Sequence, residues 1–188
     1  MNALSWIAIT LCLIMVLVLA WRARRRSSRW RERASRPREL ARADLVYAEK
    51  LFRIAQPIRL AARLDRAYRQ PDGTLVLVEL KTRSVDRPYL SDVIQLSAQK
   101  LAIEQQTEQA VAAHGFVTIE RPGPRRSGSS HRVNLLTADA VIAVARRRDA
   151  ILAGELSPKY ANSRRACEQC AFSRHCAGPQ HIAADRER

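Results

Sequence analysis

The stretch LDRAYRQPDGTLVLVELKT, residues 64–82, decides the fold of this chain. Its last part, TLVLVELKT (74–82), is rich in Leu and Val and shows no polar alternation before Glu79. A strand that is apolar on both faces is typical of the covered centre of a sheet. The turn signal PDG at 71–73 separates it from a preceding strand expected at 58–68. The sequence therefore predicts a hairpin at the centre of the domain.

Three ionisable residues of this hairpin form a candidate catalytic group. Glu79 and Lys81 are two positions apart, so they face the same way on a strand, and burying both is costly unless they are paired or bound. Asp65 lies on the preceding strand, fourteen residues before Glu79, so that the hairpin brings two carboxylates together. Such oxygen ligands suit Mg²⁺ or Mn²⁺. An isolated ELK triplet is also typical of a surface ion pair, but here Gln95 follows Lys81 by fourteen residues, at the start of the next expected helix.

A helix is expected before the hairpin, over residues 38–53. A partly apolar stripe at helical spacing supports this interpretation, and Pro57 follows the stripe as a stop signal. The stripe consists of Leu40, Ala43, Tyr47, Lys50 and Leu51.

A second helix is expected after the hairpin, from Ser91, which can cap it, to His114, with Gly115 as its stop. Apolar residues repeat along it at Ile94, Ala98, Leu101 and Ala102. Two short strands, at 116–120 and 132–136, and a last helix at 137–152 complete the series. The order predicts an α/β domain with a single mixed sheet flanked by helices.

The N-terminal segment predicts a transmembrane helix. Residues 4–21 carry no charge, and about eighteen residues at ~1.5 Å each are near the length that crosses ~30 Å of hydrocarbon. Trp6 and Trp21 lie near its two ends, and the segment 22–42 holds ten Arg against two Glu. No Lys or Arg precedes the apolar run and no clear cleavage site follows it, which favours an uncleaved anchor over a signal peptide. We expect a single-pass membrane protein whose C-terminal domain is cytoplasmic.

The 188 residues are enough for one domain of ordinary size, and their net charge is +15. Because the arginine-rich segment accounts for +8, the rest of the chain is only moderately basic. This balance suits an anionic partner such as nucleic acid, although an arginine-biased genome also explains part of it. A basic loop at 121–131, with Arg125 and Arg126, is expected to follow a phosphate backbone.

The C-terminal cysteines indicate a metal site. Cys167 and Cys170 are separated by two residues, and Cys176 follows after five more, whereas Cys12 lies in the predicted membrane span. Two thiolates at this spacing can hold one ion through a tight turn, and a disulfide framework does not suit a reducing cytoplasm. A three-cysteine cluster, a zinc site with one added histidine and free thiols all stay open.

The region 64–99, LDRAYRQPDGTLVLVELKTRSVDRPYLSDVIQLSAQ, resembles the core of RecB-like PD-(D/E)XK nucleases. The resemblance extends over about residues 40 to 180 and implies a restriction-endonuclease-like fold. It also implies that Asp65 and Glu79 are metal ligands, that Lys81 is the catalytic lysine and that Gln95 is the motif glutamine. Two departures stand out: Gln99 occupies a position where the family often has Tyr, and Ala62 and Arg63 replace the small residue common near the first Asp.

Two further site assignments follow from resemblance. Glu49 is the candidate for the family's upstream acidic motif, although it also suits a solvated helix charge. The cysteine tail resembles that of the CRISPR-associated iron-sulfur exonucleases, in which a fourth cysteine completes a 4Fe-4S cluster. This chain lacks that cysteine, so His175, His181, water or nothing would take its place, and Zn²⁺ is the alternative metal.

The expected protein is a membrane-tethered, Mg²⁺- or Mn²⁺-dependent DNA nuclease, by resemblance an exonuclease acting on single strands or ends. An inactive nucleic-acid-binding or scaffold protein with the same fold is one alternative, and a membrane-bound metal or redox module built on the cysteines is another. The expected parts are an anchor (1–21), a basic linker (22–37), a nuclease-like domain (38–160) and a cysteine-rich tail (161–188) packed on that domain.

Overall fold

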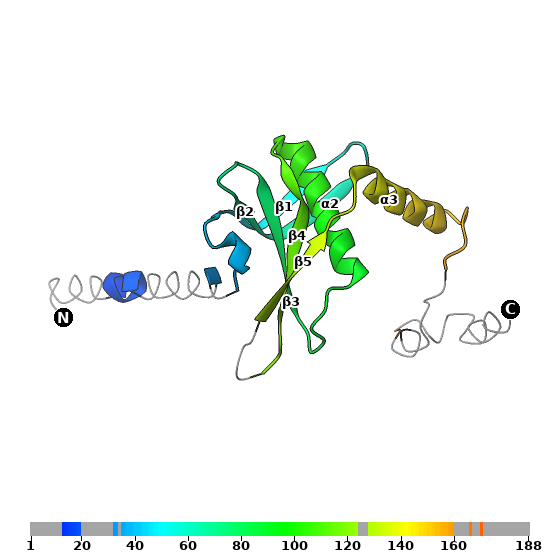
Figure 1. Cartoon of the computed structure of the whole chain (residues 1–188). Helices are drawn as coiled ribbons and strands as arrows, with labels where there is room; N and C mark the ends of the chain where they lie inside the picture. The colour runs from blue at the N-terminus through cyan, green and yellow to red at the C-terminus, as the bar shows by residue number, and fades with distance from the viewer. Residues whose placement is uncertain are drawn as a thin grey trace, which may run out of the picture. The chain divides into compact units, whose positions relative to one another are not determined.

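The computed structural model describes residues 13–19, 32–33, 35–123, 128–159, 166 and 170. The chain divides into two compact units, 1–143 and 144–188, and the first contains a five-stranded sheet (Figure 1). The strands follow each other across the sheet in chain order. They are β1 (Asp44–Ile54), β2 (Leu60–Arg69), β3 (Leu75–Thr82), β4 (Val111–Glu120) and β5 (Gly128–Asn134).

The sheet is mixed, with β3 at its centre. Strands β1, β2 and β3 pair antiparallel, β3 and β4 pair parallel, and β4 and β5 pair antiparallel. The parallel pair is connected by helix α2 (Leu90–Thr107), because two parallel neighbours need a crossover. The predicted mixed sheet and its central hairpin of β2 and β3 are therefore confirmed.

Side chains on the two faces of β3 enter different hydrophobic clusters. Leu75 and Leu77 pack in one cluster with residues of α2, including Leu96 and Ile103. The alternate side chains of β3, Val76 and Val78, enter the other cluster, together with Leu40, Ala43, Tyr68 and Phe116. Because strand side chains alternate, Glu79 and Lys81 continue the row of Leu75 and Leu77 and lie on the face that α2 covers.

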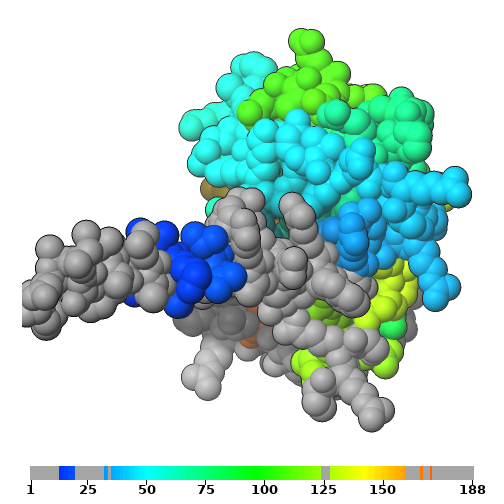
Figure 2. All heavy atoms as spheres, turned by 90° about the vertical axis from the view of Figure 1, so that its left-hand side faces the viewer, coloured from blue at the N-terminus to red at the C-terminus, as the bar shows by residue number. Residues whose placement is uncertain are grey.

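The second face is covered by the segment that precedes β1. A short 3-10 helix, η1 (Arg38–Leu40), buries Leu40 against this face. Figure 2 shows the η1 segment in blue, next to the yellow-green β5, and Arg132 Nη1 of β5 lies 3.4 Å from Glu39 Oε2. Helices or helical turns thus lie on both faces of the sheet, as the sequence predicted.

The helix predicted at 38–53 is wrong, because most of this segment is strand β1. The strand pairs with β2 from Asp44 to Ile54, with an irregularity between Leu45 and Tyr47, so the backbone groups that face β2 are hydrogen-bonded. The spaced apolar residues fit this arrangement equally well: Tyr47 packs edge-on against Phe52, with ring centroids 5.3 Å apart. Pro57 lies in the connection between the two strands.

The end predicted for the second helix is also wrong. Helix α2 ends at Thr107, where Glu108 adopts a left-handed conformation with φ of 58°, and β4 already begins at Val111. His114 and Gly115, predicted to close the helix, lie in β4 instead. The strands predicted at 116–120 and 132–136 are the longer β4 and the earlier β5, whereas the last predicted helix is confirmed as α3 (Ala138–Leu152).

Only part of the predicted membrane segment belongs to the described residues. Residues 13–19 are helical, with exposed apolar side chains, and the remainder of 4–21 lies outside the described part. None of the helices in the described part combines the length and apolar character that a membrane crossing requires.

Gly115 lies on β4 close to both β3 and α2. A Cβ at this position would be 3.0 Å from the backbone oxygen of Leu77 and 3.5 Å from Cδ1 of Leu96. Because the first contact is with backbone of the paired central strand, it cannot be relieved by a change of rotamer. A side chain here would press the sheet and the helix apart.

We predict that Gly115→Ala lowers the free energy of unfolding by roughly 1–3 kcal/mol, through overpacking. Gly128→Ala is the matched control, because its nearest contact would be an ordinary 3.7 Å. Urea unfolding of both variants measures the difference, and equal stability of Gly115→Ala and Gly128→Ala would contradict the prediction.

Candidate active site

Glu79 is a buried carboxylate near the end of the central strand, with only 2% of its surface exposed. Its Oε1 lies 2.7 Å from Lys81 Nζ and accepts a 2.7 Å hydrogen bond from Gln95 Nε2. Its Oε2 accepts a 3.0 Å hydrogen bond from Gln99 Nε2. Both oxygens of a group that is costly to bury are therefore satisfied by side chains of β3 and α2.

Lys81 and Gln95 are joined to each other as well as to Glu79. Lys81 Nζ donates to Gln95 Oε1 over 2.9 Å, while the NH₂ group of Gln95 donates to Glu79. The Lys81 side chain keeps 27% of its surface exposed, so the amine lies between the buried carboxylate and the solvent. The structure thus brings together Glu79, Lys81 and Gln95, three of the four residues predicted from sequence.

Asp65, the fourth, lies where β2 and β3 stop pairing. The ladder ends at the pair Arg66 and Val78, and its register, continued by one residue, sets Asp65 opposite Glu79. Asp65 Oδ2 accepts a 2.8 Å hydrogen bond from the backbone N–H of Leu80, in place of a ladder bond. Its other oxygen accepts no hydrogen bond from the described residues. One oxygen of Asp65 thus fixes the side chain, and the other is available to a ligand.

Burial raises the pKa of Glu79 above its ordinary value. Hydrogen bonds from Lys81 and Gln99 act in the opposite direction, and the negative charge of Asp65 raises the pKa further. A divalent cation held by both carboxylates would relieve this repulsion.

Asp92 supports the site from the first turn of α2. This residue is 3% exposed. Its Oδ2 accepts a 2.7 Å hydrogen bond from Arg83 Nη2 and a 2.8 Å hydrogen bond from the backbone N–H of Tyr89. Burial alone would raise the pKa of Asp92, but the hydrogen bonds from Arg83 and Tyr89 outweigh it and hold this pKa below its usual range. Asp92 Oδ1 also lies 4.0 Å from Lys81 Nζ. Asp92 therefore ties the start of α2 to the end of β3 beside the lysine.

Sequence reasoning missed Asp92 and left Gln99 without a role. The only signal for Asp92 was its position, an acidic residue in the first turn of a helix that directly follows the ELK motif. Glu49 differs from both: it lies on β1 rather than on a helix, has φ of 50°, and its exposed side chain makes no hydrogen bond or ion pair with described residues. The structure does not join Glu49 to the group.

The donor set fits Mg²⁺ or Mn²⁺. Asp65 and Glu79 supply hard carboxylate oxygens, and such ions commonly use one or two carboxylates and complete their shell with water and phosphate oxygens. No group of three or more His, Cys, Asp or Glu side chains suited to a metal is found among the described residues. The protein would thus contribute two carboxylates and leave several positions to solvent and substrate.

Comparison with models of protein families matches residues 11–177 to the PD-(D/E)XK nuclease superfamily. The chain belongs to this superfamily. A five-stranded mixed sheet with helices on its faces is consistent with the restriction-endonuclease-like fold. Superfamily membership supports nuclease activity and agrees with the Mg²⁺ or Mn²⁺ typical of PD-(D/E)XK nucleases.

Two solved structures are similar to this PD-(D/E)XK chain. One is the crystal structure of SSO0001, with 18% identity and a TM-score of 0.41; the similarity covers 72% of this chain and 58% of that one. The other is a candidate exonuclease from Eubacterium rectale, with 15% identity and a TM-score of 0.46, covering 76% of this chain and 56% of that one. The chain therefore spans less than two thirds of either structure. No curated protein matches the sequence.

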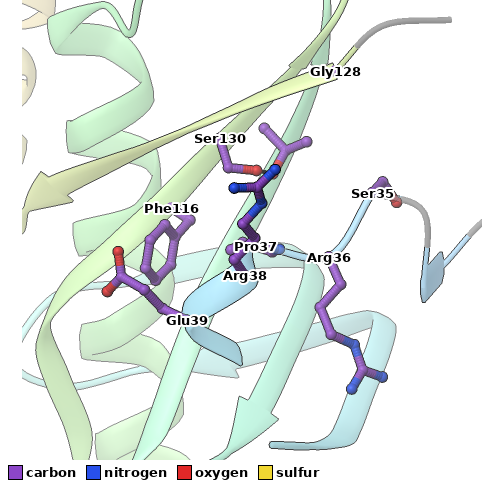
Figure 3. A pocket seen from close by; sticks show the side chains of 9 residues that line it. Ser35, Arg36, Pro37, Arg38, Glu39, Phe116, Gly128 and Ser130 are labelled. Carbon is purple, nitrogen blue, oxygen red and sulfur yellow. Dashed lines mark hydrogen bonds between the residues drawn. The ribbon is translucent and has the colours of Figure 1, made fainter. Parts of the chain in front are cut away.

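A cavity of about 590 Å³ lies on the face of the sheet opposite α2, away from Glu79 (Figure 3). Phe116, Thr118 and Ser130 line it from β4 and β5, and the Thr118 and Ser130 hydroxyls are hydrogen-bonded to each other over 2.9 Å. Residues 35–39 line its other side, and the Arg38 side chain is directed toward Ser130 (Figure 3). This cavity could not be predicted from the sequence, because the residues that line it lie far apart in the chain, at 35–39 and at 116–130.

Several predicted site residues lie outside the described part of the chain. These include Cys167 and Cys176; Cys170 is described only as an exposed, free cysteine. Arg125, Arg126 and the two C-terminal histidines also lie outside it. The metal site of the tail and the phosphate-binding loop stay predictions.

We predict that Glu79→Gln becomes more stable relative to the wild type as the pH rises. Because the folded-state pKa of Glu79 lies above the ordinary 4.5, the folded protein binds more protons than the unfolded chain in the pH window above 4.5. The free energy of unfolding of the wild type therefore falls as the pH rises through this window, because the extra bound proton is lost. The glutamine of the variant does not titrate, so the variant has no such loss. Urea unfolding in a chelating buffer, from about pH 4.5 to about pH 8, measures the difference.

Glu155→Gln is the control, because it makes the same change of charge at an exposed residue that is not among the candidate site residues. A stability difference between Glu79→Gln and wild type that stays constant across the pH range would contradict the prediction.

Proposed function

We propose that this protein is a metal-dependent nuclease that hydrolyses phosphodiester bonds of DNA, with Asp65, Glu79 and Lys81 as its catalytic residues. The observation that carries the proposal is the Glu79 carboxylate, buried beside Lys81 and within electrostatic reach of Asp65. Burying a carboxylate is unfavourable because it loses its hydration, and an apolar side chain would fill this position of β3 at lower free energy. The burial of Glu79 therefore indicates a functional site. Membership of the PD-(D/E)XK superfamily supports the same reaction.

In this proposal Asp65 and Glu79 would hold one Mg²⁺ or Mn²⁺. When bound, such an ion would activate a water and neutralise the charge that develops on the scissile phosphate. The partly exposed Lys81 amine orients the attacking water or donates to the phosphate oxygens in the transition state. The water oxygen forms the new P–O bond and releases a proton to solvent, the P–O bond to the leaving sugar oxygen breaks, and that oxygen takes a proton from solvent.

Gln95 has a positioning role in this mechanism. Its amide accepts from Lys81 and donates to Glu79, so it holds the amine and the carboxylate in one arrangement. If a cation neutralised Glu79, Lys81 would keep its contacts with Gln95 and with the Asp92 carboxylate 4.0 Å away. The lysine is then free to interact with phosphate. DNA ends or single strands are the proposed substrate class, on the basis of the resemblance to RecB-like enzymes.

We predict that the wild-type protein cleaves DNA with Mg²⁺ or Mn²⁺ and that Asp65→Asn, Glu79→Gln and Lys81→Met each lower the rate by at least about 10²-fold. Each change removes a ligand charge or the catalytic amine with little change of shape. A fluorescent assay with single-stranded and double-stranded substrates, with and without chelator, measures the rate. Chelator is expected to abolish cleavage.

Glu155→Gln and Lys159→Met are matched controls, since both residues are exposed and neither is among the proposed catalytic residues. Retained cleavage in the Asp65 and Lys81 variants would remove the mechanism. Binding of DNA by the wild type without cleavage under any metal would instead identify an inactive protein that keeps the fold.

We also propose that the N-terminal segment tethers this domain to a membrane, with the domain on the cytoplasmic side. The support is the uncharged run at 4–21 followed by arginines. We predict that the full chain resists carbonate extraction from membranes, and that the double variant Leu13→Arg/Leu17→Arg does not, because charges at a span centre are costly. The recovery of the wild-type chain in the carbonate-soluble fraction would contradict the tether.

A further inference from the structure

Gln99 is a buried polar residue on α2, one helical turn after Gln95. Only 1% of its surface is exposed, and its side-chain NH₂ group donates two hydrogen bonds. One goes to Oε2 of Glu79 over 3.0 Å, and the other goes to the backbone oxygen of Arg63 over 2.9 Å. Gln99 thus contacts β2 and β3 at the same time.

The direction of the Gln99 amide is fixed by its surroundings. A backbone oxygen and an ionised carboxylate only accept hydrogen bonds, so the NH₂ group and not the oxygen must face them. The Gln99 oxygen is then left buried with no hydrogen-bond partner among the described residues. An unpartnered buried oxygen is unfavourable. A glutamine at this position is therefore poorly explained by stability alone.

The two hydrogen bonds of Gln99 connect β2 and β3 beyond the end of their backbone pairing. The backbone ladder of these strands ends at the pair Arg66 and Val78, before it reaches the two carboxylates. Beyond that pair, Asp65 contacts β3 through the N–H of Leu80, and Gln99 connects the backbone of β2, two residues before Asp65, to Glu79. Gln99 thereby restricts how far Asp65 and Glu79 can separate.

We propose that Gln99 is a positioning residue that sets the spacing of the two carboxylates and the rotation of the Glu79 side chain. Gln95 holds one oxygen of Glu79 and Gln99 holds the other, so the plane of the carboxylate is fixed by two residues of one helix. This inference rests on the proposed function, in which Asp65 and Glu79 share one cation. Gln99 occupies the position where the family often has Tyr, so the proposed role belongs to a residue that departs from the family pattern.

The test compares Gln99→Met, which keeps the length of the side chain without its amide, with the wild-type full chain. Partners that orient metal ligands typically contribute about 10- to 100-fold to metal affinity. We expect Gln99→Met to bind Mn²⁺ about 10- to 100-fold more weakly, as measured by the electron paramagnetic resonance signal of free Mn²⁺ without DNA. The kcat at low Mn²⁺ is expected to fall, to recover at saturating Mn²⁺, and to leave the KM for DNA unchanged.

Gln105→Met is the matched control, because Gln105 lies on the same helix with an exposed side chain and no contact to the site. Wild-type Mn²⁺ affinity in Gln99→Met, or an equal loss in Gln105→Met, would overturn the inference. If wild-type protein binds no Mn²⁺ at all, the proposed nuclease fails, whereas an unchanged affinity in Gln99→Met removes only the role of Gln99.

A second measurement needs no variant and covers the case in which Gln99→Met does not fold. In ¹⁵N-labelled wild-type protein, the side-chain amide of Gln99 is expected to exchange slowly with water and to shift as Mg²⁺ is added, because its acceptor becomes a metal ligand. A Gln99 amide signal that stays unchanged while Mg²⁺ binds would overturn the inference.

Discussion

The structure around the site depends on one buried carboxylate that must be compensated. Glu79 extends from the central strand under α2, where water cannot solvate it, and burial raises its pKa. The compensation comes from Lys81 on the same strand and from two glutamines of the covering helix. Helix α2 therefore covers the apolar side chains of β3 and also supplies the hydrogen-bond donors that stabilise the buried Glu79 carboxylate.

The second carboxylate depends on an interruption of the sheet. If β2 and β3 paired along their full length, the N–H groups of β3 facing β2 would be occupied by the ladder. Because the pairing ends at Arg66 and Val78, the Leu80 N–H is available to Asp65, and the two strands separate where the acids lie. Arg83 and Asp92 then fix the end of β3 to the start of α2 through a partly buried ion pair. The end of the hairpin beyond its paired residues is thus fixed by Asp65 of β2 and by Asp92 of α2.

The hairpin and its acids could be predicted from sequence, because the signals are local. A turn at PDG, an apolar run and a spacing of two between Glu79 and Lys81 determine which side chains face the same way. The helix predicted at 38–53 failed because an apolar spacing that fits a helix also fits a paired strand, and only the ladder to β2 decides between them. Asp92 and Gln99 read as ordinary polar helix residues, and their burial follows only from the placement of α2 on β3.

The central claim is that Asp65 and Glu79 hold one divalent cation between them. The most direct measurement is a crystal structure of the protein soaked with Mn²⁺, with anomalous data that locate the ion. The account predicts a single strong peak within ligand distance of one oxygen from each of the two carboxylates, at ~2.0–2.2 Å for an ion of this class. A well-ordered site at saturating Mn²⁺ with no peak between the two side chains would contradict it.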